Sequence, residues 1–317
     1  MRTGSSVLVL LVGCSLTTVA VGDDYNYQVG LAYSSAQSDS TVVPTFGGVP
    51  DPSLGITTSS SDSDTIELTG IWYYSGLSDD NGPKSRAAFM SRASGLVISY
   101  ANGDESTATE FSGSSTIPPQ FSRSDGSNKG YSLDLRHVWK DSGWFARAGI
   151  SRTELDLELT NNVGAPAFAK FDANRYTLGV GKYLGQATTL GLAITTLDVG
   201  SSNPTVIALD FSHIGSLGAD WQWGADVAFG KSDTGGDGDT VALRGSLYPT
   251  PSIEFGLSFS RQDRSGGFDL KTTEAFGGWF VQDNIQLTAR YRLDDSDTFP
   301  GQDIDRDEFG IGVNMRF

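Results

Sequence analysis

The feature that most constrains this chain is a two-residue alternation of apolar and polar side chains that recurs along its length. Alternation with this period places the two sets of side chains on opposite faces of a β-strand. Such segments, together with less regular ones between them, cover the sequence as follows: 25–33, 66–74, 85–101, 131–139, 144–159, 174–184, 187–199, 205–214, 221–229, 240–248, 253–259, 271–281, 285–291 and 309–317. The pattern predicts an all-β protein of about 14 strands, each of roughly ten residues.

The last segment shows how the two faces differ. One face carries only apolar side chains: Phe309, Ile311, Val313, Met315 and Phe317. The opposite face carries small or polar ones: Gly310, Gly312, Asn314 and Arg316. A strand with its apolar face toward lipid and its polar face toward water is typical of a transmembrane β-barrel. The alternative is the last strand of a soluble sandwich, which would turn its apolar face inward.

This ending resembles the C-terminal strand of Gram-negative outer-membrane β-barrel proteins. Gly312, Met315 and Phe317 match a Gly-x-x-apolar-x-Phe pattern that ends on an aromatic residue. The terminal aromatic residue of this chain resembles the signal that the barrel-assembly machinery reads in that class. The resemblance therefore implies that these three residues form an assembly signal and that this machinery is a partner of the chain.

If the chain spans a membrane, it must form a closed barrel. After residue 22 no stretch approaches the roughly 18 apolar residues of a membrane helix, and only 38% of all residues are hydrophobic. Lipid offers no hydrogen-bond partner to an open strand edge, so a chain without such a helix spans a membrane only as a closed barrel. We expect a transmembrane antiparallel up-and-down β-barrel over residues 23–317.

The N-terminus has the pattern of an export signal. Arg2 supplies the positive start, 7–13 is a short apolar core, and 20–22 is a small-x-small cleavage site. We expect residues 1–22 to be a signal peptide that directs the protein to the outer membrane. The only cysteine, Cys14, lies inside it, so the mature chain would carry no thiol. The sequence 11–14 also resembles a lipoprotein cleavage box, and lipidation of Cys14 stays open as an alternative.

The connections between the expected strands alternate in length. The tight ones carry turn residues: 141–143, 185–186, 216–219, 249–251 and 282–284. The longer ones, which we expect to be polar loops, are 35–63, 102–128, 160–173, 200–204, 232–239, 262–270 and 294–307. A looser turn is expected at 79–84. Short periplasmic turns against long outer loops are typical of such barrels, so we expect both termini on the periplasmic side.

Charged residues of both signs fall on the polar faces of the expected strands. Charges placed there need water or partners, and a water-filled lumen supplies the water. We predict that the following residues line a pore: Asp134, Arg136, Lys140, Arg147, Arg175, Asp210, Asp226, Arg244, Glu254, Arg290, Arg292 and Arg316. About 14 strands at ~4.8 Å spacing and ~40° tilt give a backbone diameter near ~28 Å, which leaves room for small solutes.

These features together resemble a porin, and the size matches monomeric 14-stranded channels. General trimeric porins have more strands and a constriction loop after the fifth strand, where this chain has only the short segment 160–173. Fatty-acid transporters also have 14 strands, but they carry a plug domain before the first strand. Here the first strand is expected to begin at Tyr25, almost directly after the expected cleavage site. The resemblance implies a monomer without a plug domain, surrounded by outer-membrane lipid and lipopolysaccharide.

No enzyme, cofactor or metal centre is indicated. The two histidines, His137 and His213, fall on the apolar faces of their strands, where interfacial positions are more common than catalytic ones. Two acidic runs, at 233–239 and 303–308, contain the oxygen ligands that calcium prefers. The second run has Glu308 where a calcium loop of the EF type needs glycine, so solvated loop acids are the simpler interpretation. A net charge of −16 argues against nucleic acid as a partner.

The sequence therefore predicts a passive diffusion channel for ions and small hydrophilic solutes. The alternative is an adhesive or structural barrel with a closed lumen, whose first two long loops form the exposed surface. Those loops are rich in Ser, Thr, Gly and Asp, which favours disordered polar rims.

Overall fold

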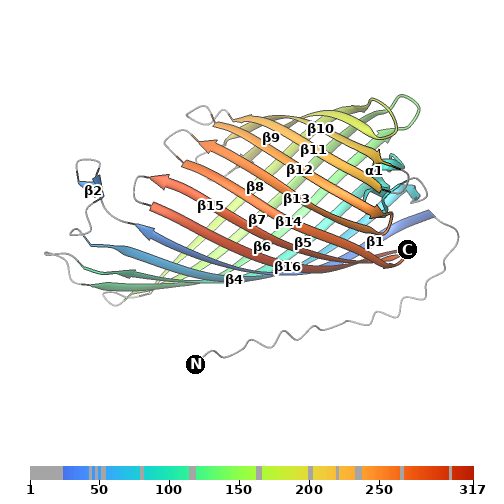
Figure 1. Ribbon diagram of the computed structural model, residues 1–317. Coiled ribbons are helices and arrows are strands. Elements are labelled where there is room, and N and C mark those ends of the chain that lie inside the picture. Colours follow the sequence, from blue (N-terminus) through green and yellow to red (C-terminus); the bar gives the residue numbers. More distant parts are fainter. Residues whose placement is uncertain are drawn as a thin grey trace.

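The computed structural model describes residues 24–317, except 43–44, 47–48, 51–54, 79–81, 114–118, 162–165, 199–202, 219–220, 233–237, 265–267 and 300–301. It is a closed barrel of 14 antiparallel strands in which consecutive strands pair and the first pairs with the last (Figure 1). The strands are β1 (Asp24–Val42), β4 (Thr57–Ser78), β5 (Gly95–Phe111), β6 (Gln120–Trp139), β7 (Trp144–Asn161), β8 (Ala167–Tyr183), β9 (Thr188–Asp198), β10 (Thr205–Leu217), β11 (Trp221–Ser232), β12 (Gly238–Thr250), β13 (Ile253–Arg264), β14 (Phe268–Gln282), β15 (Ile285–Phe299) and β16 (Gln302–Arg316). The predicted fold class and strand number are confirmed.

The barrel closes where the two ends of the chain meet. β1 pairs with β16 over its whole length beyond Gln28, from the pair Gln28 and Arg316 outward. The backbone N–H of Phe317 donates to the carbonyl of Tyr27 at 2.8 Å, and the N–H of Tyr27 donates back to the carbonyl of Phe317 at 3.0 Å. The last residue of the chain therefore forms part of the seam.

Apolar side chains cover the outside of the barrel, as the alternation predicts. Leu178 and Leu257 are 67% and 64% exposed, and many other large apolar side chains are exposed in the same way. Trp139 and Trp144 face each other across the turn between β6 and β7. A soluble protein rarely exposes so continuous an apolar surface, whereas a barrel in lipid needs one. No helix in the described residues is long and apolar enough to cross a membrane.

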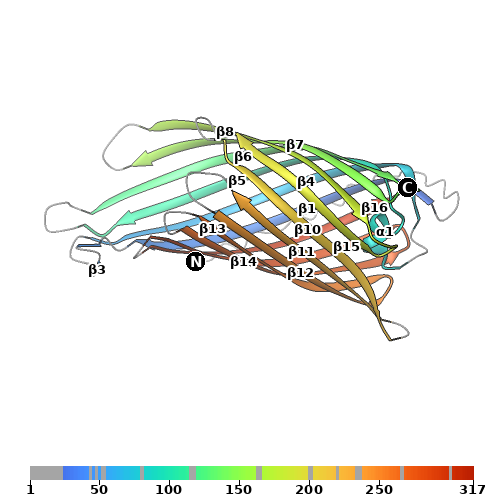
Figure 2. The same cartoon turned by 90° about the horizontal axis from the view of Figure 1, so that it is seen from above.

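The two ends of the barrel differ. At one end, here called the turn end, lie the C-terminus and the short connections 140–143, 184–187, 251–252 and 283–284. At the other, the loop end, the strands reach different heights. β1 and β4–β8 contain 17–22 residues, whereas β9–β13 contain 11–13. The long strands extend beyond the short ones as a curved projecting sheet (Figure 2).

The prediction of long polar loops at this end was wrong for the first two connections, and also for 160–173, 262–270 and 294–307, which are mostly strand. Residues 35–42 and 57–63 are strand, as are most of 102–128, so the connections shrink to 43–56 and 112–119. A small hairpin of β2 (Thr45–Phe46) and β3 (Val49–Pro50) lies within the first. Hydroxyl pairs join the projecting strands across their inner face, for example Ser38 to Ser61 at 2.8 Å and Ser59 to Thr109 at 2.8 Å. Cross-strand Ser and Thr pairs stabilise sheets, so composition alone was a poor guide here.

The prediction that residues 85–101 form one strand was also wrong. The segment begins with a 3₁₀ turn, η2 (Lys84–Arg86), and a single helical turn, α1 (Ala87–Met90). β5 starts only at Gly95. Within the described residues these are the only helical pieces, so no plug domain is evident. The departure has a physical reason, because residues 82–94 turn into the barrel instead of continuing the wall.

Candidate functional site in the barrel interior

Strand register places the predicted lumen residues. Each of them except Lys140 lies at a position that alternates with the exposed apolar side chains, and therefore on the inner face. These residues are Asp134 and Arg136 on β6, Arg147 on β7, Arg175 on β8, Asp210 on β10, Asp226 on β11, Arg244 on β12, Glu254 on β13, Arg290 and Arg292 on β15, and Arg316 on β16. The placement of Lys140 was wrong, because β6 ends at Trp139 and Lys140 lies in the following turn.

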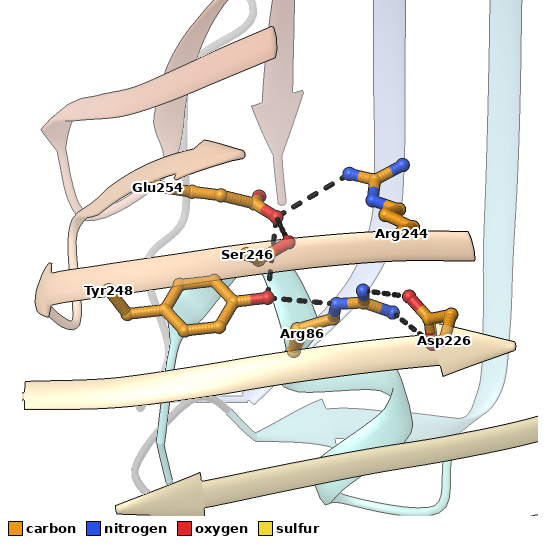
Figure 3. Close-up of polar contacts among 6 residues, drawn as sticks. All are labelled: Arg86, Asp226, Arg244, Ser246, Tyr248 and Glu254. Carbon is orange, nitrogen blue, oxygen red and sulfur yellow. Dashed lines mark hydrogen bonds and ion pairs between the residues drawn. The ribbon is translucent and has the colours of Figure 1, made fainter. Parts of the chain in front are cut away.

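Residues 82–94, here called the crossbar, cross the lumen at the turn end. They connect β4 to β5, yet Arg86 reaches β11 and β12, which lie on the opposite wall of the barrel. The Arg86 guanidinium forms an ion pair with Asp226 and donates a hydrogen bond to the Tyr248 hydroxyl at 3.0 Å (Figure 3). A contact between opposite walls passes through the interior, so the crossbar lies inside the barrel.

The carboxylate of Glu254 holds the other side of this network. It accepts hydrogen bonds from Ser246 at 2.9 Å and from Tyr248 at 3.3 Å, and Arg244 approaches it at 3.4 Å (Figure 3). Tyr248 is 1% exposed and Glu254 is 8% exposed. The Tyr248 hydroxyl therefore lies between two charged side chains and links Arg86 of the crossbar to Glu254 of the wall.

The charge of Arg86 is secured by this contact. Burial alone would lower its pKa, but the hydrogen bond to Asp226 and the nearby charges raise it by more, so the pKa of Arg86 lies above its ordinary value. A guanidinium is the side chain that suits a buried ion pair of this kind, because it stays charged and donates several hydrogen bonds in a fixed geometry.

Lys84 ties the start of the crossbar to three further elements. Its backbone N–H donates to the carbonyl of Pro251 at 2.8 Å, and its own carbonyl accepts from Arg316 at 2.7 Å. Its ammonium group lies 2.6 Å from Asp283 in the turn between β14 and β15. The Lys84 ammonium lowers the pKa of the Asp283 carboxyl group.

Two apolar clusters anchor the rest of the crossbar. Phe89 packs in a buried cluster with wall residues from four strands: Val138, Phe145, Tyr183 and Ile214. Ala87 and Ala93 pack in a second cluster, with Tyr73 and Leu77 of β4. The Tyr183 hydroxyl also donates to the Phe89 carbonyl at 3.0 Å. The crossbar is thus held by side-chain packing and hydrogen bonds, and by no strand pairing among the described residues.

Arg92 lies near the end of the crossbar, in a backbone conformation that favours glycine. Its φ is 51°, the one positive value among the described residues other than glycine. Its guanidinium donates to the carbonyl of Gly185 at 2.9 Å and lies 4.9 Å from the centre of the Tyr183 ring. Gly82, at the other end, has a φ of 130°. Both ends of the crossbar therefore have backbone geometry that an ordinary strand would not use.

Above the crossbar the lumen holds a cavity of about 360 Å³. Charged residues of both signs line it, among them Arg244, Glu254, Glu274 and Arg290, and Ser85 of the crossbar lies at its edge. Arg290 is paired with Glu308 at 2.6 Å, and Arg244 lies over the Phe276 ring at 3.8 Å from its centre. The polar interior that the sequence predicts is thus present, and its arginines are held against the wall.

Glycines on the inner face let long side chains lie flat. Arg147 pairs with Asp210 although β8 and β9 lie between their strands. A Cβ atom on Gly179 would lie 2.6 Å from Arg147 Nε, and one on Gly191 would lie 2.6 Å from Asp210 Oδ2. Because these two glycines have no side chain, Arg147 and Asp210 can reach each other along the inner face of the wall.

We expect Gly179→Ala to disturb this ion pair. The new methyl group meets Arg147 and also a backbone oxygen at 2.9 Å, so we expect a loss of about 1–3 kcal/mol in stability and a lower temperature for loss of the folded barrel in gel-shift assays. Gly130→Ala is the matched control, because its Cβ would be 3.6 Å from the nearest atom. Equal behaviour of the two variants would contradict the role assigned to Gly179.

The two histidines lie among aromatic residues on the outer face. His137 Nδ1 lies 3.0 Å from the Tyr74 hydroxyl, and its ring packs edge-on against Trp139. His213 Nδ1 lies 2.8 Å from the Thr188 hydroxyl. Neither histidine touches the crossbar or the polar residues of the lumen. Their surroundings fit an interfacial aromatic belt.

The described residues contain no group of three His, Cys, Asp or Glu side chains arranged to hold a metal ion. Of the two acidic runs singled out in the sequence, Asp233 and Asp237 fall outside the described residues. In the second run, the Glu308 carboxylate forms an ion pair with Arg290.

The sequence analysis missed the residues that cross the lumen: Lys84, Arg86, Phe89, Arg92 and Tyr248. One signal was available. The connection between β4 and β5 is much longer than the others at the turn end, and a periplasmic turn of that length is unusual. The alternating pattern read into 85–101 concealed it.

No protein-family model and no curated protein sequence matches this chain. Solved structures do. The outer membrane protein Omp33 of Acinetobacter baumannii is 15% identical, with a TM-score of 0.55 over 94% of this chain and 100% of that one. The P. putida toluene transporter TodX is 12% identical, with a TM-score of 0.54 over 92% of this chain and 90% of that one. At these identities the likeness concerns the fold, which is that of outer-membrane β-barrel proteins.

Proposed function

We propose that this protein is an outer-membrane channel for passive diffusion of ions and small hydrophilic solutes, with the crossbar as the element that limits its flow. The observation that carries the proposal is a closed 14-strand barrel with a charged interior that, among the described residues, one short segment crosses at one end. Side-chain packing and hydrogen bonds hold that segment, and no strand pairing among the described residues does, so it can move without unfolding the wall. The solved structures of similar fold include the toluene transporter TodX and a mutant of the same protein described as a monoaromatic hydrocarbon channel, which supports transport as the general role.

In this proposal the turn end lies in the periplasm and the loop end outside the cell, as in other barrels of this kind. Residues 1–22 are removed as a signal peptide, the chain works as a monomer in a lipopolysaccharide membrane, and Gly312, Met315 and Phe317 guide its insertion. It needs no cofactor and performs no chemistry. Mass spectrometry of the purified mature protein tests the first point, because we expect its N-terminus at Asp23.

A planar-bilayer recording tests the channel itself. We expect discrete conductance steps from the purified protein, with brief closures. Absence of conductance in both the wild type and a variant without the crossbar contacts would contradict the proposal. It would favour the second candidate, an adhesive or structural barrel, for which the projecting sheet at the loop end is the specific supporting observation.

Ion selectivity should depend on salt. The loop end carries many acidic residues, among them Asp39, Asp62, Asp104, Glu105 and Glu110, whereas the lumen set has more arginines than carboxylates. Charges at an exposed mouth act over a Debye length of roughly 8–10 Å at physiological salt and fade as salt rises. We expect weak cation selectivity at low salt that vanishes or turns slightly anionic at high salt. Reversal potentials in a KCl gradient measure it, and strong anion selectivity at low salt would contradict it.

The contact of Lys84 with Asp283 predicts an effect of acid. The pKa of Asp283 is lowered in the folded protein, so the contact is fully present above the ordinary pKa of the carboxyl group and is lost as pH falls through the lowered value. Asp283 is largely exposed, so the effect should be small. We expect the wild-type channel to open more often only below about pH 4. In Asp283→Asn the ion pair is absent at every pH, so we expect this increase in acid to be absent. An unchanged acid response in that variant would assign the response to other groups.

A further inference from the structure

The polarity of β7 and β8 inverts where they leave the barrel. Up to Ile150 the outer face of β7 is apolar. Beyond it, the outer face carries Arg152, Glu154, Asp156 and Glu158. The inner face changes in the opposite sense, from Arg147 and Ser151 to Leu155, Leu157 and Leu159. β8 repeats the change, because charged side chains lie outside and Ala169 and Phe171 lie inside, with Phe171 opposite Leu155.

This inversion creates an apolar stripe above the membrane. Phe171 is 56% exposed and Leu159 is 41% exposed, so the stripe is open on the side that faces the mouth of the barrel. Where water surrounds the strands at the rim of a barrel, apolar side chains on their inner face do not stabilise them. Charged residues turned outward and leucines turned inward are the pattern of a sheet that packs against something on its inner side.

The same strand ends in an unpaired edge. β8 pairs with β7 from Ala167 onward, but its pairing with β9 starts only at Asn174, opposite Asp198. Among the described residues, 167–173 therefore have a strand on one side only. Proteins protect such edges with proline, with bulges or with a covering segment. Residues 167–173 contain no proline and one lysine, and no described segment covers them.

The charges beside this edge are mainly acidic. Glu154, Asp156, Glu158 and Asp172 lie on the outer face against Arg152 and Lys170. Arg152 pairs with Glu154 at 2.9 Å and with Asp172 at 3.1 Å, and Lys170 pairs with Asp156 at 3.3 Å. Glu158 forms no ion pair with another described residue. A net negative outer face remains next to the apolar inner one.

We propose that the edge of β8 at 167–173 binds an extended peptide, which adds a strand to the projecting sheet. Backbone hydrogen bonds to this edge, which no described strand pairs with on that side, supply the affinity, as in other cases of strand addition. Alternate side chains of the peptide meet the two faces of the sheet, so the favoured sequence alternates apolar residues, which pack on Phe171 and the leucines, with basic residues beside the acidic outer face. This inference does not depend on the proposed channel function.

Two other occupants fit the geometry less well. Small molecules bind in concave pockets that enclose them, whereas the stripe is an open sheet. A second copy of the chain would need its β8 edge to pair with this one. Parallel pairing of the two edges needs a twofold axis along the strands, which are tilted by about 35–45° in such barrels, so the second barrel would be tipped relative to the first. Antiparallel pairing needs a twofold axis normal to the sheet, which would turn the second barrel upside down. Neither arrangement leaves both barrels in one membrane.

Fluorescence anisotropy with the protein in lipid nanodiscs tests the proposal. The probe is a labelled peptide of alternating valine and lysine, long enough to pair with 167–173, and the control is the same peptide with every amide N-methylated, which keeps its charge. We expect saturable binding of the first and at least tenfold weaker binding of the second. Equal binding of both would overturn the proposal, because attraction to acidic residues alone would then explain it.

Two variants of one strand locate the site. Phe171→Ser removes an inner apolar contact and should weaken binding at least tenfold. Phe168→Ser is the matched control, because Phe168 lies on the outer face of β8 and is 76% exposed. Gel mobility before and after heating verifies that both barrels are folded. Equal loss in the two variants would overturn the assignment, and so would protein self-association that the peptide relieves, which would assign the edge to a second copy.

Discussion

Replacement of Arg86 with alanine is expected to raise the time-averaged conductance of single channels by at least tenfold. The change removes the ion pair with Asp226 and the hydrogen bond to Tyr248. A hydrogen bond between charged groups contributes about 1.5–3 kcal/mol, and a loss of about 2 kcal/mol shifts the balance between a seated and a displaced crossbar by roughly thirtyfold. The measurement is a planar-bilayer recording at fixed voltage.

Lys140→Ala is the matched control for this variant. Lys140 also carries a positive charge at the turn end, but it lies in an exposed turn and no described contact joins its side chain to the crossbar. We expect its conductance to equal that of the wild type. If Arg86→Ala and Lys140→Ala behave alike, the charge of this end of the barrel and not the crossbar sets the conductance.

Deletion of Phe317 is expected to abolish assembly. The backbone of Phe317 exchanges hydrogen bonds with Tyr27 at the seam, and its N–H and carbonyl are the last groups to join β16 to β1. The residue also ends the motif that resembles the assembly signal of outer-membrane barrels. We expect the folded, heat-modifiable form to disappear from membranes and the chain to be degraded in the periplasm.

Phe317→Tyr separates the two contributions. It keeps an aromatic end and the backbone contacts, so we expect normal amounts of folded protein. Phe317→Ala keeps only the backbone contacts, and we expect it to assemble poorly. Normal assembly after deletion of Phe317 would mean that neither the seam contacts nor the terminal motif is needed.

The sequence was most informative where lipid constrains it. Between Phe309 and Arg316, for example, lipid on one side and water on the other force a strict alternation, which fixes both the strand and the direction of each side chain. The inner position of Arg147, Asp210 or Arg290 follows from that period alone. Lys140 was misplaced because the period cannot show where a strand stops, and β6 ends one residue earlier.

Outside the lipid belt the sequence was less informative. The stretch 57–63 is polar on both faces, so no alternation marks it as strand, and only its pairing with β1 and β5 makes it one. The crossbar is the opposite case. Its conformation depends on Asp226, Tyr248 and Phe145, which lie far away in the sequence, and no local pattern predicts contacts across a barrel.

The most direct test of a channel limited by its crossbar is the conductance of a variant in which 82–94 are replaced by a short Gly-Ser turn, after gel mobility has verified that the barrel is folded. If the barrel is a channel limited by its crossbar, this variant should be permanently open, with a steady conductance well above that of the wild type and without closures. A folded variant that conducts no more than the wild type would contradict the account, because the lumen would then be closed by something other than the crossbar.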